Sequence, residues 1–584
     1  MTLSGAFQIG RSALTAAQVA IQVTGNNVSN AATPGYSRQT LSLAGAQDQR
    51  FGNNFIGRGV DVLSIRRQAD DALQSRLWSS ISNQSRAASD STLLANVETS
   101  LNALDPDASL SARVNSFFNS WSNLADNPTA SGNRALVVQS GRQLSAAVRD
   151  LRSDLVGQRD QVDRTLATAA GRANDLLGQL ANLNTQIVTA EGGQGQASSL
   201  RDQRDVIIGQ LAEYLDVTPI PQANGGIDLL VGSTPVVLAG RSRGVELRIR
   251  TENGVTHAAL VTGDNKEVLP VTSGQVGSLL AQRDTLVNDT ITRLDEIATN
   301  LIAQVNRAHA LGHPSGPLTA ANGTLGLRTS DQNTPINDPA NLTFAGLPGA
   351  IRPTAGEIHI TVRNTATGAT ETVALRVDLD GIDNSFAHST ADDTTPEALR
   401  ASINGISNLS ATFSPEGKLQ INAASGYQFT IDSDTSGAVA AFGINTYFSG
   451  TSAQNIAVRD ELIADPNGLA AGGTDKDNPT SNAAALAIAQ LRSKPLDALG
   501  GVTLNDRWDQ AVQGVAVKAS AARTSSLATQ TVRENLDAQR SSLAGVSLDE
   551  EAINLLNYQR QYQAAARYIT AVDEMTQTLL QIAR

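Results

Sequence analysis

The segment Ser547–Leu579 reads SLDEEAINLLNYQRQYQAAARYITAVDEMTQTL and is the most informative part of the chain. Its apolar residues recur in alternating steps of three and four, the spacing of a helix that packs against another helix. Ser547 and Glu550 have capping-box spacing, and Asp549 adds negative charge where the helix dipole is positive. We predict one long helix with a seam formed by Leu555, Tyr558, Tyr562, Ala565, Ile569, Val572 and Leu579, with Thr576 as its one polar member. Met575, next to Thr576, is assigned to the same assembly interface.

The head of the chain carries a similar pattern. Large apolar residues lie seven apart with small or polar residues between them, and no Asp or Glu precedes Asp48. One such stripe can belong to an ordinary core helix. Two of them at opposite ends of one chain, with small residues that permit close approach, favour packing between subunits. We predict a helix over residues 2–30 with a seam formed by Phe7, Gly10, Leu14, Ala17, Ile21, Thr24 and Val28.

An asparagine-rich stretch and the sequence Thr33-Pro34-Gly35-Tyr36 follow this helix. Proline fixes φ and glycine accepts a positive φ, so the four residues predict a type II turn. Residues 37–65 alternate polar and apolar side chains and predict extended chain that ends in a short strand. We assign to the assembly interface, besides the two seams, Asn30, Pro34, Gly35 and Tyr36.

Composition limits the classes of protein to consider. The 584 residues are too many for one core and suggest three or four domains. The net charge of −12 argues against nucleic acid as a partner. The absence of cysteine removes disulfides and thiolate chemistry. We find no secretory signal and no apolar run long enough for membrane insertion, so these rules alone would predict a cytoplasmic protein.

The order of elements predicts an α+β multidomain protein with a nested organisation. Long helical stretches are expected at 68–105, 109–126, 131–190, 198–214, 276–309 and 505–541, and strands predominate in two internal regions. We divide the chain into a terminal coiled-coil assembly domain (1–65 and 545–584), a helical inner domain with long helices (66–215, 272–314 and 480–544), a small β-rich segment (216–271) and a β-rich outer domain inserted at 315–479.

Candidate chemical sites are few. His309 and His313 have the i, i+4 spacing of a metal pair, but Gly312 and Pro314 break the helix and no third ligand is apparent, so we interpret both as structural or surface residues. Asp432–Gly437 resembles the start of a calcium loop but lacks the glutamate that should end it, and predicts a turn. The group Asp378, Asp380 and Asp383 also predicts a turn. We expect no catalytic residues, no metal and no cofactor.

Three segments resemble a known family. The head sequence VSNAATPGYSRQ (28–39), the tail sequence SLDEEAINLL (547–556) with YQRQYQA (558–564), and LRDQRD (200–205) are similar to signatures of the flagellar rod, hook and hook-associated family. The long helices are unlike the mostly β hook protein. The Thr-Pro-Gly-Tyr turn is absent from flagellin and from the second junction protein. The resemblance therefore points to the hook-associated branch that joins hook to filament, with the hook or distal rod protein as the alternative.

The resemblance also implies partners and a location. The head and tail helices would pair as a coiled coil and assemble with other copies into a helical ring on the hook tip. The partners implied are the chain itself, the flagellar hook protein, the second hook–filament junction protein and a cytoplasmic export chaperone that covers the tail helix. The chain would reach the extracellular flagellum through the type III export apparatus without a cleavable signal, and would serve motility. An adhesive or enzymatic role of the 315–479 region is the remaining alternative.

Overall fold

The computed structural model describes residues 3–51, 54–101, 109–192, 195–252, 255–314, 317–382, 385–472 and 481–582. The chain divides into two compact units, each of which combines distant stretches of sequence. The first comprises residues 1–93, 161–284 and 519–584, and the second comprises residues 94–160 and 285–518. Three long helices contribute residues to both units: α2 (Asp71–Leu101), α4 (Ser131–Glu191) and α13 (Leu504–Ala544).

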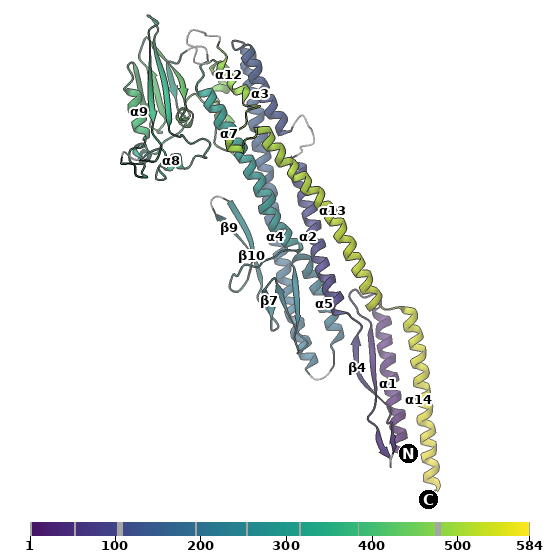
Figure 1. Cartoon of the computed structure of the whole chain (residues 1–584). Coiled ribbons are helices and arrows are strands. Elements are labelled where there is room, and N and C mark those ends of the chain that lie inside the picture. Colours follow the sequence, from purple (N-terminus) through teal and green to yellow (C-terminus); the bar gives the residue numbers. More distant parts are fainter. Residues whose placement is uncertain are drawn as a thin grey trace. The chain divides into compact units, whose positions relative to one another are not determined.

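The first unit contains both ends of the chain. Helices α1 (Leu3–Asn30) and α14 (Leu548–Ile582) pack side by side, and the N- and C-termini lie at the same end of this pair (Figure 1). Strands β1 (Gln39–Gly45) and β4 (Val60–Arg67) form an antiparallel ribbon against α1, and β2 (Gln49–Phe51) pairs with β3 (Asn54–Ile56) between them. The ribbon meets α1 closely, because the Val60 N–H donates to Ser12 Oγ at 3.2 Å.

The remainder of the first unit is a helical hairpin with small antiparallel sheets. The end of α4 and α5 (Ser198–Tyr214) form the hairpin, and α6 (Gly274–Gln282) packs on α5. Strands β5 (Val217–Pro221), β6 (Ile227–Val231), β7 (Thr234–Leu238) and β8 (Arg241–Ser242) form one sheet, while β9 (Val245–Glu252) pairs with β10 (Val255–Thr262). Alternate residues of β6 are buried, as expected for a sheet with one face on a core.

The second unit has a helical part built around α3 (Leu110–Asp126), α7 (Asp289–Ala310) and α12 (Ala483–Gln490). A short π-helical segment, Arg283–Asn288, precedes α7. The core is aromatic: Phe117, Trp121, Tyr447 and Phe448 are fully buried, with ring centroids of neighbouring pairs 4.7 to 6.3 Å apart. Short elements complete this part: β17 (Phe448–Ser449), β18 (Ala457–Val458), α11 (Asp460–Ala464) and two 3₁₀ turns, Pro466–Gly468 and Asp497–Leu499.

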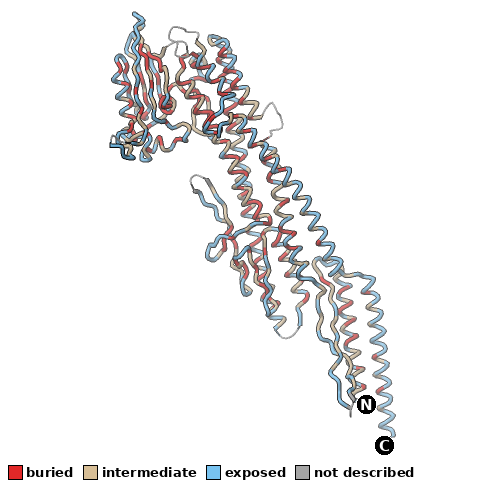
Figure 2. The backbone as a smooth tube through the Cα atoms, viewed as in Figure 1, coloured by how far each residue is buried: buried red, intermediate tan, exposed pale blue. Residues whose placement is uncertain are grey.

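The β-rich part of the second unit has two three-stranded antiparallel sheets and short helices that share one apolar core (Figure 2). One sheet has the order β13-β12-β16 and the other β11-β15-β14. Their bounds are β11 (Ala320–Asn322), β12 (Gly356–Asn364), β13 (Thr370–Val377), β14 (Leu409–Phe413), β15 (Leu419–Ala423) and β16 (Tyr427–Asp434). The helices are a 3₁₀ turn (Thr329–Asn333), α8 (Leu342–Ala345), α9 (Pro396–Asn404) and α10 (Ala438–Ala441).

The predicted α+β class with long helices and internal sheets is confirmed. The predicted helices at 109–126, 131–190 and 198–214 agree with α3, α4 and α5 to within a residue. The predicted helix 276–309 is interrupted by the π-helical segment, which apolar spacing did not reveal. The finer division into four domains stays a prediction. Among the described helices, none is both long and apolar enough to cross a bilayer.

Candidate assembly site

The pairing of α1 with α14 is antiparallel and close. Gly10 near the start of α1 lies against Ile569, and Asn27 near its end contacts Glu551 at the start of α14. A Cβ atom at position 10 would lie 2.7 Å from Ile569 Cγ1, so only glycine permits this approach of the helices. Helix α14 is largely exposed (Figure 2). Among its described residues only Glu551, Ala565 and Val572 are buried, and the last two belong to the predicted tail seam.

The head helix buries the small members of its predicted seam, Gly10, Ala17 and Thr24, and leaves the large members more accessible. Its buried residues are mostly small and are Ala6, Gly10, Ala16, Ala17, Ala20, Val23, Thr24 and Asn27. The large members of the stripe stay accessible: Phe7 is 46% and Val28 40% exposed, and Leu14 and Ile21 are half-buried. Small side chains let two helices approach, so the compact face pairs within the chain and the bulky face does not.

A buried polar cluster joins the end of α1, the turn after it and the start of α14. The Asn27 side chain is 1% exposed and makes four hydrogen bonds: Nδ2 donates to Gln39 O and Glu551 Oε2, and Oδ1 accepts from Gln39 N and the Tyr36 hydroxyl. Arg38 Nη2 lies 2.6 Å from Glu551 Oε1 and Arg38 Nη1 lies 2.9 Å from Glu550 Oε2. Every polar atom of the asparagine is thus satisfied, as burial requires.

The same turn is fastened to α5 by the LRDQRD segment. The Ser37 N–H donates to Asp202 Oδ2 at 3.2 Å, and Arg67 Nη1 at the end of β4 donates to Asp202 Oδ1 at 2.9 Å and to Asp205 Oδ2 at 2.6 Å. Gly35 has φ of +79°, and a Cβ there would lie 2.3 Å from Val206 Cγ2. The turn therefore needs glycine both for its conformation and for its contact with α5.

Charge and burial set the ionisation of this cluster. Burial, reinforced by Asp202 and Glu551, raises the pKa of Tyr36 to about 12, so its hydroxyl remains a donor. Burial also raises the pKa of the Asp205 carboxyl, against the opposing pull of Arg67 and Arg204. Burial lowers the pKa of Arg67, but the adjacent carboxylates outweigh it and the net pKa is raised. The arrangement is a set of buried ion pairs that holds three distant segments in one geometry and offers no reactive group.

Comparison with known proteins fits this arrangement. A model of the flagellar hook-associated protein FlgK helical domain matches residues 94–326, a model of the flagellar basal body rod FlgEFG protein C-terminal region matches 538–582, and a flagella basal body rod protein model matches 7–36. Flagellar hook-associated protein 1 of Salmonella typhimurium is 26% identical over 98% of both chains, and that of Bacillus subtilis is 24% identical over 97% of this chain and 96% of its own. Over nearly its whole length the chain is thus similar to proteins of the hook-associated protein 1 family.

The flagellar hook junction protein FlgK from Burkholderia pseudomallei has a similar fold. It is 17% identical in sequence, its TM-score is 0.50, and the match covers 80% of this chain and all of that one. The hook-associated protein 1 family consists of structural components of the flagellum at the hook–filament junction and is not enzymatic. The chain is therefore a flagellar component that assembles with others.

The residues assigned to the interface from sequence lie at three places in the first unit. Ala17, Ala565 and Val572 are buried between the helices, and Leu555, Tyr558 and Ile569 are half-buried there. The exposed members are Phe7, Val28, Pro34, Tyr562, Met575 and Leu579, of which Met575 and Leu579 are each about half exposed. Asn30, Gly35 and Tyr36 lie at the turn, in which the Tyr36 N–H donates to Thr33 O at 3.2 Å. The positive φ of Gly35 after Pro34 makes the turn type II, as predicted.

Sequence reasoning missed the residues that fix this turn in place. The contacts of Asn27 with Glu551 and of Arg67 with Asp202 were not recognised, because the partners are distant in the sequence. One signal was available: Asp202 and Asp205 are three apart on one helix face, which suits a single guanidinium. The predicted capping box is half formed, because the Glu550 N–H reaches Ser547 Oγ at 3.5 Å while the Glu550 carboxylate turns to Arg38.

The two histidines considered as ligands are buried in the second unit. His309 donates from Nδ1 to Asn445 O at 2.7 Å and accepts at Nε2 from the Ala470 N–H at 3.0 Å. Burial lowers the pKa of His309 to about 4, so the ring is neutral and serves as a structural bridge. His313 is also buried, and its backbone N–H donates to Gly472 O. The interpretation of His309 as structural is confirmed.

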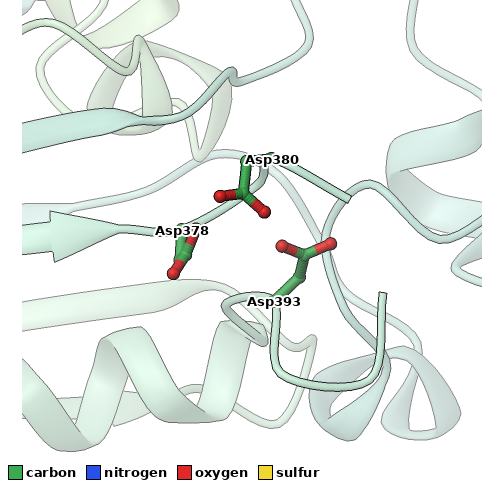
Figure 3. A group of neighbouring side chains, drawn as sticks. All are labelled: Asp378, Asp380 and Asp393. Carbon is green, nitrogen blue, oxygen red and sulfur yellow. The ribbon is translucent and has the colours of Figure 1, made fainter. Parts of the chain in front are cut away.

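Three carboxylates come together in the β-rich part, Asp378, Asp380 and Asp393 (Figure 3). Their oxygens lie within 4.8 Å of one another, but each acid already has a protein partner. Asp378 pairs with Arg376, Asp380 accepts from the Ile382 N–H in the predicted turn, and Asp393 accepts from Asn337. We therefore assign no ligand to them. Asp383, the third acid of the sequence prediction, lies outside the described residues.

Proposed function

We propose that the chain forms a helical ring on the tip of the hook and provides the surface on which the second hook–filament junction protein assembles. The observation that carries this proposal is the paired arrangement of α1 and α14. Each helix uses one face for its partner and leaves apolar residues of the other face accessible, as a protein that assembles through its ends requires. The similarity to the hook-associated protein 1 family supports the same role.

The polar cluster contributes to this role by positioning. The seams can meet other subunits in a defined geometry only if the helix pair has a fixed direction relative to α5. Arg67 and Asp202 fix that direction, and Gly35 sets the point at which the chain leaves α1. A buried ion pair adds little net stability but penalises other arrangements, so it suits a positioning function.

The proposed partners follow from the faces that remain free. The flagellar hook protein would contact one end of the ring and the second junction protein the other. A cytoplasmic chaperone would cover the exposed apolar residues of α14 before export, because residues such as Met575 and Leu579 promote aggregation in a free chain. The chain would travel to the extracellular flagellum through the type III apparatus.

Electron microscopy and motility of a strain that lacks this chain test the proposal. We expect bare hooks, flagellin shed into the medium and no swimming, with all three restored by the wild-type chain. Missing hooks would overturn the assignment in favour of a rod or hook component. Intact filaments would overturn any junction role.

A further inference from the structure

A pocket of about 340 Å³ lies in the second unit, between one face of α4 and a wall formed by β18 and α11. Its side chains on α4 recur at intervals of three and four residues, so they share one face of that helix. The polar members from α4 are Gln139, Arg142, Gln143, Ser145 and Arg149. None of the residues that line the pocket belongs to the assembly site.

The pocket carries positive charge that the fold does not neutralise. Arg149 is half-buried and donates to the Ile456 carbonyl oxygen, and among the described residues it forms no ion pair with a carboxylate. Arg152, three residues farther along α4, is by contrast paired with Asp295 at 2.9 Å. A guanidinium has five N–H donors, and the bond to Ile456 engages one of them. Arg149, together with the exposed Arg142, can therefore bind an anion.

The other charged group of the pocket limits the charge of that anion. Asp460 also lines the pocket, so two arginines and one aspartate leave a single net positive charge. One carboxylate matches this charge, whereas the second negative charge of a phosphate would be repelled by Asp460. The amides of Gln139 and Gln143 both donate and accept hydrogen bonds, which suits hydroxyl groups rather than further charge.

Two further features of the wall favour a hydroxylated ring. Ser145 is 1% exposed, and its Oγ has no hydrogen-bond partner among the described residues, which is costly for a buried hydroxyl. A ligand oxygen that reaches this wall would supply the missing partner. Ala146, Val458 and Ile463 give the pocket an apolar side, and Ile463 is 37% exposed. The C–H face of a sugar ring can cover such a surface.

We propose that this pocket binds an acidic sugar, that is, one ring with a single carboxylate and several hydroxyl groups. The carboxylate would contact Arg142 and Arg149. The hydroxyl groups would meet the two glutamine amides and Asp460, and the ring face would cover Ile463. A few placed polar groups beside an apolar wall are typical of small-molecule sites, and the volume holds one ring rather than a chain. The inference goes beyond the proposed function and does not depend on it.

Titration calorimetry of the purified full-length chain tests the proposal, with sodium galacturonate as the probe. We expect saturable binding, and at least about tenfold weaker binding of galactose, which lacks the carboxylate, and of acetate, which lacks the ring. No binding of galacturonate would overturn the proposal. Equal affinity for galactose or for acetate would also overturn it, because the site would then not recognise both parts of the ligand.

A free sugar acid and the end of an acidic polysaccharide share this chemistry. A trimer of galacturonate distinguishes the two sources. Tighter binding of the trimer than of the monomer identifies the polysaccharide, and equal or weaker binding identifies the free acid.

Substitutions locate the binding. Arg149→Gln and Arg142→Gln should each weaken galacturonate binding about tenfold. The matched control is Arg328→Gln, which removes the same charge from an exposed position of the same unit outside the pocket and should bind like the wild type. Circular dichroism checks that each variant is folded. If Arg149→Gln does not fold, Arg142→Gln decides the question, because its exposed side chain is not part of the core.

Unchanged binding in the folded pocket variants would assign the sugar to another place and overturn the proposal. Filaments should be normal in all three variants, because the pocket lies outside the assembly site. Failure of the binding test would therefore leave the junction role in place, and bare hooks in the deletion strain would be expected whether or not the pocket binds a sugar.

Discussion

The stripe on α7 and the stripe on α1 have the same type of spacing but different surroundings. Ile291, Leu294 and Leu301 on α7 are all buried within their own unit, whereas Phe7 and Val28 on α1 remain accessible. Apolar spacing thus identifies a face that packs, but it does not say which chain supplies the partner. Charge is the additional signal. Helix α7 carries several charged residues beside its apolar stripe, including Asp289, Arg293 and Glu296, whereas Arg11 is the only charged residue of α1.

A charge in the terminal seam should have the largest effect. We expect Ile569→Asp to abolish filaments, because a carboxylate would face the uncharged contact at Gly10. Electron microscopy of the cells measures this, and far-ultraviolet circular dichroism of the purified chain checks that most of the helix content remains. Thr570→Asp, at an exposed neighbouring position, is the control and should leave filaments intact. Normal filaments with Ile569→Asp would mean that the tail seam is not used in assembly.

Arg67→Met should destabilise the first unit by about 3–5 kcal/mol, because it leaves the buried Asp202 carboxylate without its cation and leaves Asp205 with only Arg204, at 3.8 Å. The pKa of Asp205, already raised by burial, should rise further. A carboxyl whose folded pKa is raised stabilises the fold when protonated, so the variant should gain stability as pH falls through that pKa. Urea unfolding at several pH values measures both effects. A loss that does not depend on pH would argue against unpaired carboxylates as its cause.

Truncating one side chain in each apolar stripe should distinguish the stripe of α7 from the stripe of α1. Leu294→Ala removes a fully buried side chain and should lower the free energy of unfolding of the second unit by about 2–5 kcal/mol. Phe7→Ala removes an accessible side chain and should change the stability of the free chain by no more than about 0.5 kcal/mol, although it should weaken assembly. Chemical denaturation and filament counts give the two readouts. Equal losses of stability would show that the head stripe is a core stripe after all.

Acid should weaken the second unit through His309. The ring is neutral in the fold, with its pKa lowered from 6.5 to about 4. Such a group contributes stability above the unfolded pKa, and that stability is lost as pH falls from 6.5 toward 4, by at most about 3 kcal/mol. Calorimetry across this range measures the loss. His309→Gln, which can still donate and accept, should remove this pH dependence, and its persistence in that variant would assign it to another group.

Much of the fold could be predicted because the helices and strands have strong local patterns. Ser198–Tyr214 appears at its predicted bounds, and the Gly35 turn has the conformation that its proline and glycine predict. The π-helical segment Arg283–Asn288 could not be predicted, since apolar spacing continues through it and its fully buried Arg283 is held by Asp163 and Thr256.

The candidate site was only partly predictable for a different reason. The seam residues follow from the spacing of apolar residues, which is a local sequence pattern. The cluster of Asn27, Arg38 and Glu551 depends on contacts between residues hundreds of positions apart, and no local pattern encodes them. On α1, Gly10, Ala17 and Thr24 of the predicted seam are buried, whereas Phe7 and Val28 stay exposed. Gly10 shows that close helix contact can select the smallest side chains.

The hydrogen bond between Asn27 and Glu551 spans 524 positions of sequence. Helix α1 therefore cannot meet α14 until nearly the whole chain is available, however quickly either helix forms by itself. When a ribosome or a pore delivers the polypeptide from one end, the first terminal helix has no partner until the other end arrives. Bringing two such distant segments together is also slow compared with local folding. The order of events is thus built into the topology: the internal segments can fold during delivery, and the helix pair completes the molecule last.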